Sequence, residues 1–319
     1  MNIKKRLKQL IIFIKCYYYS TIYRRKKNSN EDVWLICERG NDARDNGYTF
    51  YKYLKKHHKE INLKYVITKD SPDYEKIAKE DVVIYGSKEH YILITTAKYL
   101  ISTHIMGFSP DFRLFTKIDK YNIIKYNGKK IFLQHGIIKD YSPGLSKENT
   151  NLDIFICGAQ PEYDYLLKTS GYTQDVLKYT GLSRYDFLIN KVVKKRILIM
   201  PTWRMNLYYS NKNNKFTDSS YFKNWNGLLN NKQFLNIVEK NNIEVIFYPH
   251  YEMQKYIHQF NTKSKNVIIA NQKEYDVQNL ILTSNILITD YSSVFFDFAY
   301  LNKEVIYFQF DYEEYRKEH

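Results

Sequence analysis

The sequence predicts an α/β protein built from two domains. At 319 residues the chain is long enough to bury two separate hydrophobic cores. From Asp32 onward, short runs rich in β-branched residues alternate with polar or amphipathic stretches, as in a parallel sheet whose strands alternate with helices. The alternation pauses at the polar stretch 190–195 and then restarts. Each half therefore predicts a Rossmann-like unit, and we expect the two halves to face each other across a cleft.

The β-branched runs give the expected strands. In the first half they are 33–37, 63–68, 82–85, 99–102, 131–134 and 154–157, and in the second half 196–200, 244–248, 267–270, 286–289 and 305–308. The predicted division is an N-terminal segment 1–28, a first Rossmann-like domain 29–190 and a second one 191–319. The sequence contains neither GxGxxG nor GxxxxGK[ST], so neither a dinucleotide fingerprint nor a Walker loop is indicated.

The first 27 residues predict a basic amphipathic helix. They contain nine Lys or Arg residues and no acid, and apolar residues recur at helical spacing at Ile3, Leu7, Leu10, Ile11, Ile14 and Tyr18. The apolar run 10–14 is far shorter than the ~20 residues that a bilayer span needs, and no small-residue cleavage site follows it. We expect the helix to lie on an anionic membrane, with positive charge supplied by Lys4, Lys5, Arg6, Lys8, Arg24 and Arg25. The alternative is a helix that packs on the protein's own surface.

Charge and cysteine content limit the classes of binding partner and the compartment that the sequence predicts. The formal charge of +15 implies an anionic partner such as nucleic acid, a membrane or a phosphorylated substrate. No nucleic-acid partner is expected, because the charge is concentrated in the first 27 residues and no RRM, KH or helix-turn-helix signature appears. Cys16, Cys37 and Cys157 are far apart, so neither a disulfide framework nor a zinc site is predicted and a reducing cytoplasm fits best. We expect no metal and no cofactor.

Two histidines follow predicted strands, one in each half. His135 ends the run Phe-Leu-Gln-His-Gly, and Gly136 would let backbone approach a substrate closely. His250 ends Ile-Phe-Tyr-Pro-His in the second half. Histidine titrates near neutral pH, so it can take a proton from an attacking hydroxyl or assist a departing phosphate. A structural role is the alternative for each.

Three further motifs are candidates for phosphate binding. Asp290, Ser292 and Ser293 follow the buried run 286–289 and precede an apolar helix, whose N-terminus is an anion site if a serine caps it. An N-cap without a ligand is an equal alternative. Arg204 in PTWR is a candidate to grip phosphate oxygens. For Arg184 we favour a structural ion pair, for which the adjacent Asp186 is a candidate.

These motifs, taken in order, resemble the CDP-glycerol glycerophosphotransferase family. The series is DNGYTFYKYL (45–54), QHG (134–136), TGLSRYD (180–186), PTWR (201–204), YPH (248–250) and ITDYSSVFFDFA (288–299), and the resemblance covers roughly residues 30–315. It implies a GT-B architecture with an acceptor domain, 29–190, and a CDP-donor domain, 191–319, at the cytoplasmic face of the membrane. The implied reaction transfers glycerol phosphate or a related polyol phosphate from CDP-glycerol or CDP-ribitol to a lipid-linked, teichoic acid or capsule acceptor, and releases CMP.

The resemblance also implies roles for individual residues. His135 matches the histidine assigned as the base, and His250 matches the one that assists the departing CMP. Arg204, Asp290, Ser292 and Ser293 match positions expected to line the donor's phosphates or polyol. Family members usually continue past the segment DYEEYR, whereas this sequence ends at His319, which raises the expectation of a truncated second domain. The alternatives are a GT-B glycosyltransferase that uses a nucleotide sugar and a non-catalytic module that binds a membrane or an anionic polymer.

Overall fold

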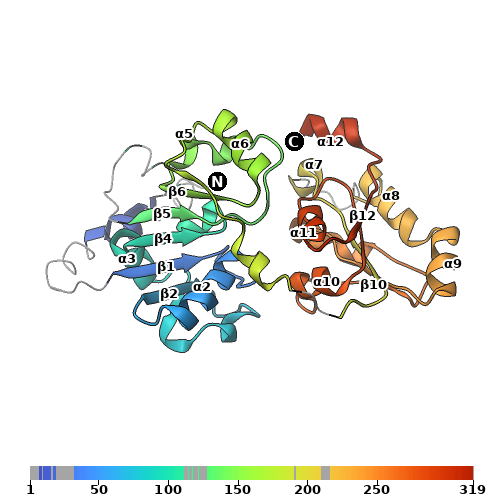
Figure 1. Ribbon diagram of the computed structural model, residues 1–319, viewed down its shortest axis with the longest axis horizontal. Coiled ribbons are helices and arrows are strands. Elements are labelled where there is room, and N and C mark those ends of the chain that lie inside the picture. The colour runs from blue at the N-terminus through green and yellow to red at the C-terminus, as the bar shows by residue number, and fades with distance from the viewer. Residues whose placement is uncertain are drawn as a thin grey trace. The chain divides into compact units, whose positions relative to one another are not determined.

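The computed structural model describes residues 7–8, 10–15, 17–18, 32–110, 114, 117, 121, 128–189, 192–209 and 216–318. It contains two sheets of parallel strands, which confirms the α/β class (Figure 1). The chain divides into two compact units, Met1–Phe187 and Leu188–His319, and each unit is described by itself. Of the residues expected to face a membrane, Lys4, Lys5, Arg6, Arg24 and Arg25 lie outside the described residues.

The first unit contains a seven-stranded sheet of order β3-β2-β1-β4-β5-β6-β7. Its strands are β1 (Val33–Cys37), β2 (Asn62–Ile67), β3 (Val82–Ile84), β4 (Tyr99–Ser102), β5 (Lys129–Phe132), β6 (Ile154–Cys157) and β7 (Leu177–Tyr179). Its helices are α2 (Asn46–His57), α3 (Lys88–Thr96), α5 (Lys147–Thr150) and α6 (Gln160–Thr169), with 3₁₀ turns η1 (Tyr74–Lys76), η2 (Lys79–Asp81), η3 (Ile105–Phe108), η4 (Pro143–Leu145) and η5 (Ser183–Phe187). The strand order reverses between β1 and β4, which is the switch point of a doubly wound sheet.

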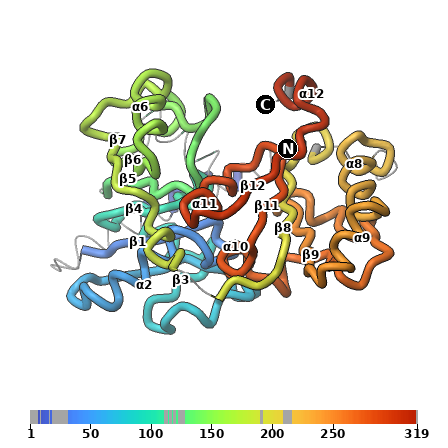
Figure 2. The backbone as a smooth tube through the Cα atoms, turned by 45° about the vertical axis from the view of Figure 1, so that its right-hand side comes forward, coloured from blue at the N-terminus to red at the C-terminus, as the bar shows by residue number. Residues whose placement is uncertain are grey.

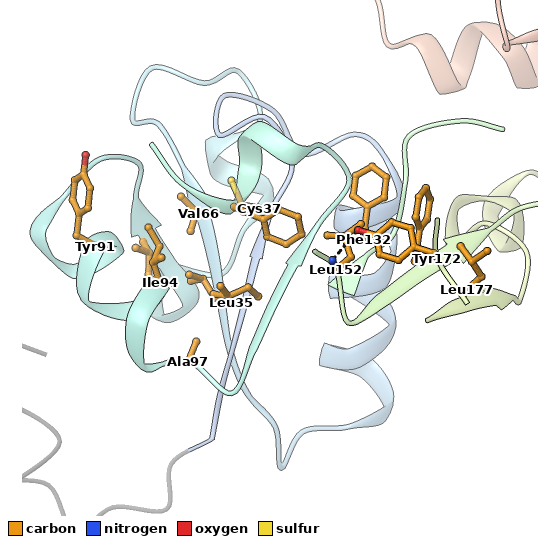
Figure 3. Close-up of a cluster of buried hydrophobic side chains, with 14 of the residues drawn as sticks. Leu35, Cys37, Val66, Tyr91, Ile94, Ala97, Phe132, Leu152, Tyr172 and Leu177 are labelled. Carbon is orange, nitrogen blue, oxygen red and sulfur yellow. Dashed lines mark hydrogen bonds between the residues drawn. The ribbon is translucent and has the colours of Figure 1, made fainter. Parts of the chain in front are cut away.

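The two faces of this sheet carry two separate cores, because alternate strand residues point to opposite faces. On one face Leu35 and Cys37 of β1 pack with Tyr91 and Ile94 of α3 (Figure 3). Leu166 of α6 belongs to the same core. The other face takes the intervening β1 residue Ile36, together with Tyr51 and Leu54 of α2. The sheet is therefore a middle layer between helices.

The second unit contains a five-stranded sheet of order β10-β9-β8-β11-β12. Figure 2 shows β9, β8, β11 and β12 following one another in this order. Its strands are β8 (Arg196–Met200), β9 (Glu244–Phe247), β10 (Val267–Ile269), β11 (Ile286–Thr289) and β12 (Glu304–Tyr307). Its helices are α7 (Met205–Tyr209), α8 (Ser220–Leu229), α9 (Lys232–Lys240), α10 (Val277–Thr283), α11 (Phe295–Tyr300) and α12 (Tyr312–Glu318), with the 3₁₀ segment η7 (Tyr251–Gln259). One core on this sheet is centred on Trp225 and Phe247. The order reverses between β8 and β11, as it does between β1 and β4 in the first unit.

The predicted strands all occur, with ends that move by one or two residues. The strand β7, Leu177–Tyr179, was not predicted, because it is three residues long at the sheet edge and two of its residues are exposed. A short, half-exposed strand of this kind lacks the apolar run on which the prediction relies.

The N-terminal segment is helical at residues 10–15. Phe13 is buried in the first core and meets Tyr91 edge to face at 5.9 Å, and Leu10 and Tyr17 pack against the same core. The expected apolar stripe is therefore wrong for Leu10, which faces the protein. The remaining described members of that stripe are exposed, namely Leu7, Ile11, Ile14 and Tyr18. Within the described part of the chain, no helix is both long and apolar enough to cross a bilayer.

Candidate functional site

His135 lies just past the carboxyl end of β5. The backbone N–H of Leu133 still donates to the Ser102 carbonyl of β4 at 2.8 Å, and the chain then turns at Gln134, whose φ of 61° lies in the left-handed region. A non-glycine residue rarely adopts this conformation unless its surroundings hold it there. The turn leaves the His135 side chain exposed, while Gly136 is buried.

A buried carboxylate holds the turn from one side. The Gln134 side-chain amide donates to the Ile156 carbonyl at 2.7 Å and to Glu162 Oε1 at 3.0 Å. Glu162 also accepts the backbone N–H groups of Ile138 and Gly158. Burial raises the pKa of Glu162, although these hydrogen bonds oppose the shift. The strained Gln134 backbone is thus fixed by contacts to β6 and α6.

A second set of contacts holds the turn from the side of α2. Asn46 Nδ2 donates to the Gln134 carbonyl at 2.8 Å, and Asn46 Oδ1 accepts the backbone N–H of Arg184 at 2.9 Å. The buried Arg184 guanidinium donates through Nη1 to the His135 carbonyl at 2.7 Å and pairs with Asp45 at 2.9 Å. Arg184 therefore has the structural role that we favoured, with Asp45 as its ion-pair partner.

The contacts of His135 define its tautomer. Its Nδ1 lies 3.2 Å from the Thr103 carbonyl oxygen, which can only accept a hydrogen bond, so Nδ1 carries the proton. The Nε2 lone pair then remains available as a base. Although the ring is exposed, the protein packed around it displaces enough water to lower the pKa of His135, and the nearby Asp45 opposes this shift. At neutral pH the ring is therefore predominantly neutral.

A second histidine, which the sequence analysis missed, lies against His135. The His104 and His135 rings stack with centroids 4.2 Å apart and planes 17° apart. The register of the parallel strands β4 and β5 pairs Ser102 with Phe132, so residues just beyond both strand ends meet. The sequence feature that could have pointed to His104 is its place two residues after the predicted strand 99–102, at the same sheet edge as His135.

The first βα junction of this unit is filled by a protein carboxylate. Glu38, directly after β1, is buried and accepts the backbone N–H groups of Arg44, Asp45 and Tyr48 at 2.8–3.0 Å. These N–H groups belong to the start of α2, where a doubly wound fold usually binds phosphate. Burial raises the pKa of Glu38 well above its usual value. Glu38 thus occupies the place that a phosphate would take.

In the second unit the matching position holds Arg204 between two carboxylates. Arg204 Nε and Nη2 donate to Asp311 at 2.9 and 3.0 Å, and Nη2 donates to Asp290 at 2.8 Å. Its Nη1 donates to the carbonyls of Thr202 and Trp203. All five guanidinium N–H groups thus have protein acceptors, and the side chain is 3% exposed. We expected Arg204 to grip phosphate, but this arrangement makes it a structural clamp.

Asp290 is likewise committed to protein groups. It is fully buried, and its Oδ1 accepts the backbone N–H groups of Thr202 and Tyr291 at 2.8 and 2.7 Å. Because Thr202 follows β8 and Tyr291 follows β11, Asp290 joins the two sides of the switch point. Like Arg204, the Asp290 carboxylate holds the backbone of the site. From the sequence we expected it to contact the substrate instead.

Ser292 and Ser293 are half-buried in the turn after β11. The helix α11 begins at Phe295, with Val294 as its N-cap and no side-chain cap. The Ser292 hydroxyl instead accepts the Val294 N–H at a long 3.4 Å. The helix thus begins later than a serine N-cap would require, because the intervening residues form a turn.

His250 follows β9 with the tautomer opposite to that of His135. Its Nδ1 accepts the backbone N–H of Glu252 at 3.3 Å, which requires Nδ1 to be unprotonated and places the ring proton on Nε2. The ring stacks at 6.3 Å on Trp203 of the PTWR segment. One histidine thus presents a lone pair at Nε2, and the other presents a proton there. Among the described residues, no group of three or more His, Cys, Asp or Glu side chains is placed to hold a metal ion.

Comparison with known proteins identifies relatives of this chain. Residues 17–319 match the family described as CDP-Glycerol:Poly(glycerophosphate) glycerophosphotransferase. The minor teichoic acid biosynthesis protein GgaB of Bacillus subtilis is 35% identical over 98% of this chain, which spans 36% of that protein. The teichoic acid glycerol-phosphate transferase of Staphylococcus aureus is 25% identical over 99% of this chain and 83% of its own length. The chain thus spans about a third of the length of the first of these relatives.

A solved structure shares the fold. A variant of the wall teichoic acid polymerase TagF, soaked with CDPG, matches with a TM-score of 0.67 and 18% identity. The match covers 98% of this chain and 79% of that structure. At this identity the likeness supports the fold alone.

Proposed function

This chain belongs to the CDP-glycerol:poly(glycerophosphate) glycerophosphotransferase family, and on that premise we propose that it transfers a polyol phosphate from a CDP-activated donor to an acceptor hydroxyl. The observation that carries the proposal is the family match over residues 17–319. The donor is CDP-glycerol or CDP-ribitol, and the acceptor is a lipid-linked primer or a teichoic acid or capsule polymer. We assign the acceptor to the first unit and the donor to the second, in the GT-B manner.

His135 serves as the general base in this proposal. Its Nε2 lone pair takes the proton from the acceptor hydroxyl, and the resulting oxygen attacks the β-phosphorus of the donor. The bond between that phosphorus and the bridging oxygen breaks, and CMP leaves. The hydrogen bond to the Thr103 carbonyl supports this role because it keeps the proton on Nδ1. The lowered pKa keeps the ring neutral before the reaction.

His250 assists the departure of CMP. The Nε2–H proton, fixed by the contact between Nδ1 and the Glu252 backbone, is a hydrogen-bond donor for the oxygen on which negative charge develops. A metal ion is not required for either step. The buried Arg204 and Asp290 hold the backbone after β8 and β11, while Ser292, Ser293 and Gly136 contact the phosphates or the polyol.

The test is CMP release by the full chain with each donor and a detergent-solubilised lipid-linked acceptor. His135→Gln keeps a polar side chain without a titrating nitrogen, and we expect CMP release to fall about 100-fold or more. His57→Gln is the matched control, because His57 is an exposed histidine at the end of α2. Release from UDP-sugars but not from CDP-polyols would contradict the proposal, and so would a His135→Gln variant as active as wild type.

We further propose that the N-terminal helix binds the cytoplasmic face of the membrane peripherally. Phe13 docks one side of the helix on the first core, and the exposed Leu7, Ile11, Ile14 and Tyr18 recur at the helical spacing of a single stripe on the neighbouring side. Lys8 is exposed beside that stripe. An apolar stripe with adjacent positive charge suits an anionic bilayer surface.

Vesicle co-sedimentation tests this second proposal. We expect the chain to sediment with vesicles that contain anionic phosphatidylglycerol and to be released by the double change Ile11→Glu and Ile14→Glu. Ile237→Glu is the control, since Ile237 is an equally exposed apolar residue on α9. Equal sedimentation of wild type and double variant would refute the membrane role without affecting the proposed reaction.

A further inference from the structure

We propose that His104 is a positioning residue for His135, whose ring it holds in the orientation and tautomer that a general base needs. The inference rests on the proposed role of His135. It is carried by the stacked pair, in which two imidazole rings lie 4.2 Å apart and within 17° of parallel. Such a stack limits rotation of the exposed His135 ring about its side-chain bonds.

Thr103 contacts both histidine rings. Its carbonyl oxygen accepts from His135 Nδ1 at 3.2 Å, and its hydroxyl lies 2.9 Å from His104 Nδ1. One residue therefore fixes one nitrogen of each ring. If the His135 ring turned over, Nδ1 would lose its hydrogen bond to the Thr103 carbonyl. Nothing would then keep the proton on Nδ1 and the lone pair on Nε2.

His104 is itself held firmly. Its carbonyl accepts the Gly107 N–H at 2.9 Å, and its backbone N–H donates to the Ser102 hydroxyl oxygen at 3.2 Å. A Cβ at Gly107 would lie 2.0 Å from the Glu38 carbonyl oxygen, so only glycine permits this approach to the end of β1. The His104 backbone is thus tied to the switch point of the first sheet, which makes it a fixed surface for the His135 ring.

The pair also limits how many protons the site can carry. Two stacked imidazolium rings repel each other, so protonation of one ring disfavours protonation of the other and their titrations are coupled. Three other charged groups act on His135, namely Asp45 at the start of α2, Arg39 after β1 and Arg184 in η5. These three groups are unchanged in a His104 variant, so any altered titration of His135 reports on His104.

The experiment is a pH titration of ¹⁵N-histidine-labelled full chain by NMR, without any substrate, with the His135 signal assigned through His135→Gln. In wild type we expect the Nδ1–H tautomer and a titration spread over two steps. His104→Phe, which keeps an aromatic stack without a titrating group, should keep the tautomer and titrate in one step. His104→Ala should lose the fixed tautomer, with a kcat for CMP release about tenfold lower and an unchanged KM.

His57→Ala is the matched control, because His57 also lies against an aromatic ring, that of Tyr53 at 4.8 Å, but on the exposed surface of α2. Circular dichroism verifies that each variant is folded. A His104→Ala variant whose His135 tautomer and titration match wild type would overturn the inference. Because the NMR measurement needs no donor, an inactive wild type would count against the proposed reaction and leave the positioning role supported.

Discussion

The two units share one strand order but fill their first βα junctions in opposite ways. In the first unit the carboxyl group of the buried Glu38 accepts the N–H groups at the start of α2. In the second unit a buried cation, Arg204, lies between Asp290 and Asp311. Both switch points are therefore occupied by protein charges, which explains the missing glycine-rich fingerprint. The groups proposed to react lie one strand further out, at the exposed His135 after β5 and the half-buried His250 after β9.

This comparison separates the residues that we propose to react from those that hold the backbone of the site. Arg204, Asp290 and Arg184 are buried charged groups that form hydrogen bonds with protein atoms, whereas His135 is open to solvent. Substitution of a supporting residue should lower stability, and substitution of His135 should lower activity alone.

The largest effect is expected at His135. His135→Asn should lower kcat for CMP release by about 100- to 10,000-fold, since a positioned base contributes that much to proton transfer. The free energy of unfolding should stay within about 0.5 kcal/mol of wild type, because the side chain is exposed. Parallel rate assays and urea titrations measure both quantities. A large loss of stability would show that His135 has a structural role like that of the buried residues, and would contradict the distinction drawn between them.

A loss of about 3–5 kcal/mol in unfolding free energy is expected for Arg204→Met, because Asp290 and Asp311 would remain buried without their cation. Urea unfolding followed by the fluorescence of Trp203 and Trp225, in a Trp34→Phe background, reports on the second unit alone. Arg316→Met on the exposed face of α12 is the control and should change little. If both variants unfolded alike, the clamp would contribute nothing to stability.

A smaller effect is expected for Glu38→Gln, about 1–3 kcal/mol at neutral pH, because an amide cannot accept all three N–H groups. Burial raises the pKa of Glu38 in the folded state, so its contribution to stability is fully present below the pKa of the unfolded chain, near 4.5, and is lost as pH rises through the folded value. Denaturant midpoints measured from pH 4 to 8 should therefore vary less in the variant. Glu75→Gln, an exposed substitution, should leave the wild-type pH dependence intact.

The smallest effect concerns the pH profile. The pKa of His135 is lowered from its ordinary 6.5, so kcat/KM for CMP release should decline on the acidic side with a midpoint below 6.5. Asp45→Asn removes the carboxylate that raises this pKa and should move the midpoint further down. A midpoint that rises in Asp45→Asn would contradict the assignment of the acidic limb to His135.

The amino-acid sequence was enough to predict the α/β class, every strand but β7 and the position of both histidines at strand ends. Those features depend on local patterns of apolar residues, which single-sequence reasoning reads well. The ordered motifs also sufficed to identify the family, since six short segments in one order carry more information than any one of them.

The contacts that each motif residue makes became known only from the tertiary structure. Arg204 and Asp290 read as phosphate ligands in sequence, but the register of β8 and β11 and the distant Asp311 turn them into a buried clamp. His104 became visible only because β4 and β5 pair Ser102 with Phe132. The tautomers of His135 and His250 depend on backbone groups of neighbouring segments. Contacts between residues far apart in the chain leave no local pattern in the sequence. These contacts decide whether a side chain is available to bind a ligand or is held by other protein groups.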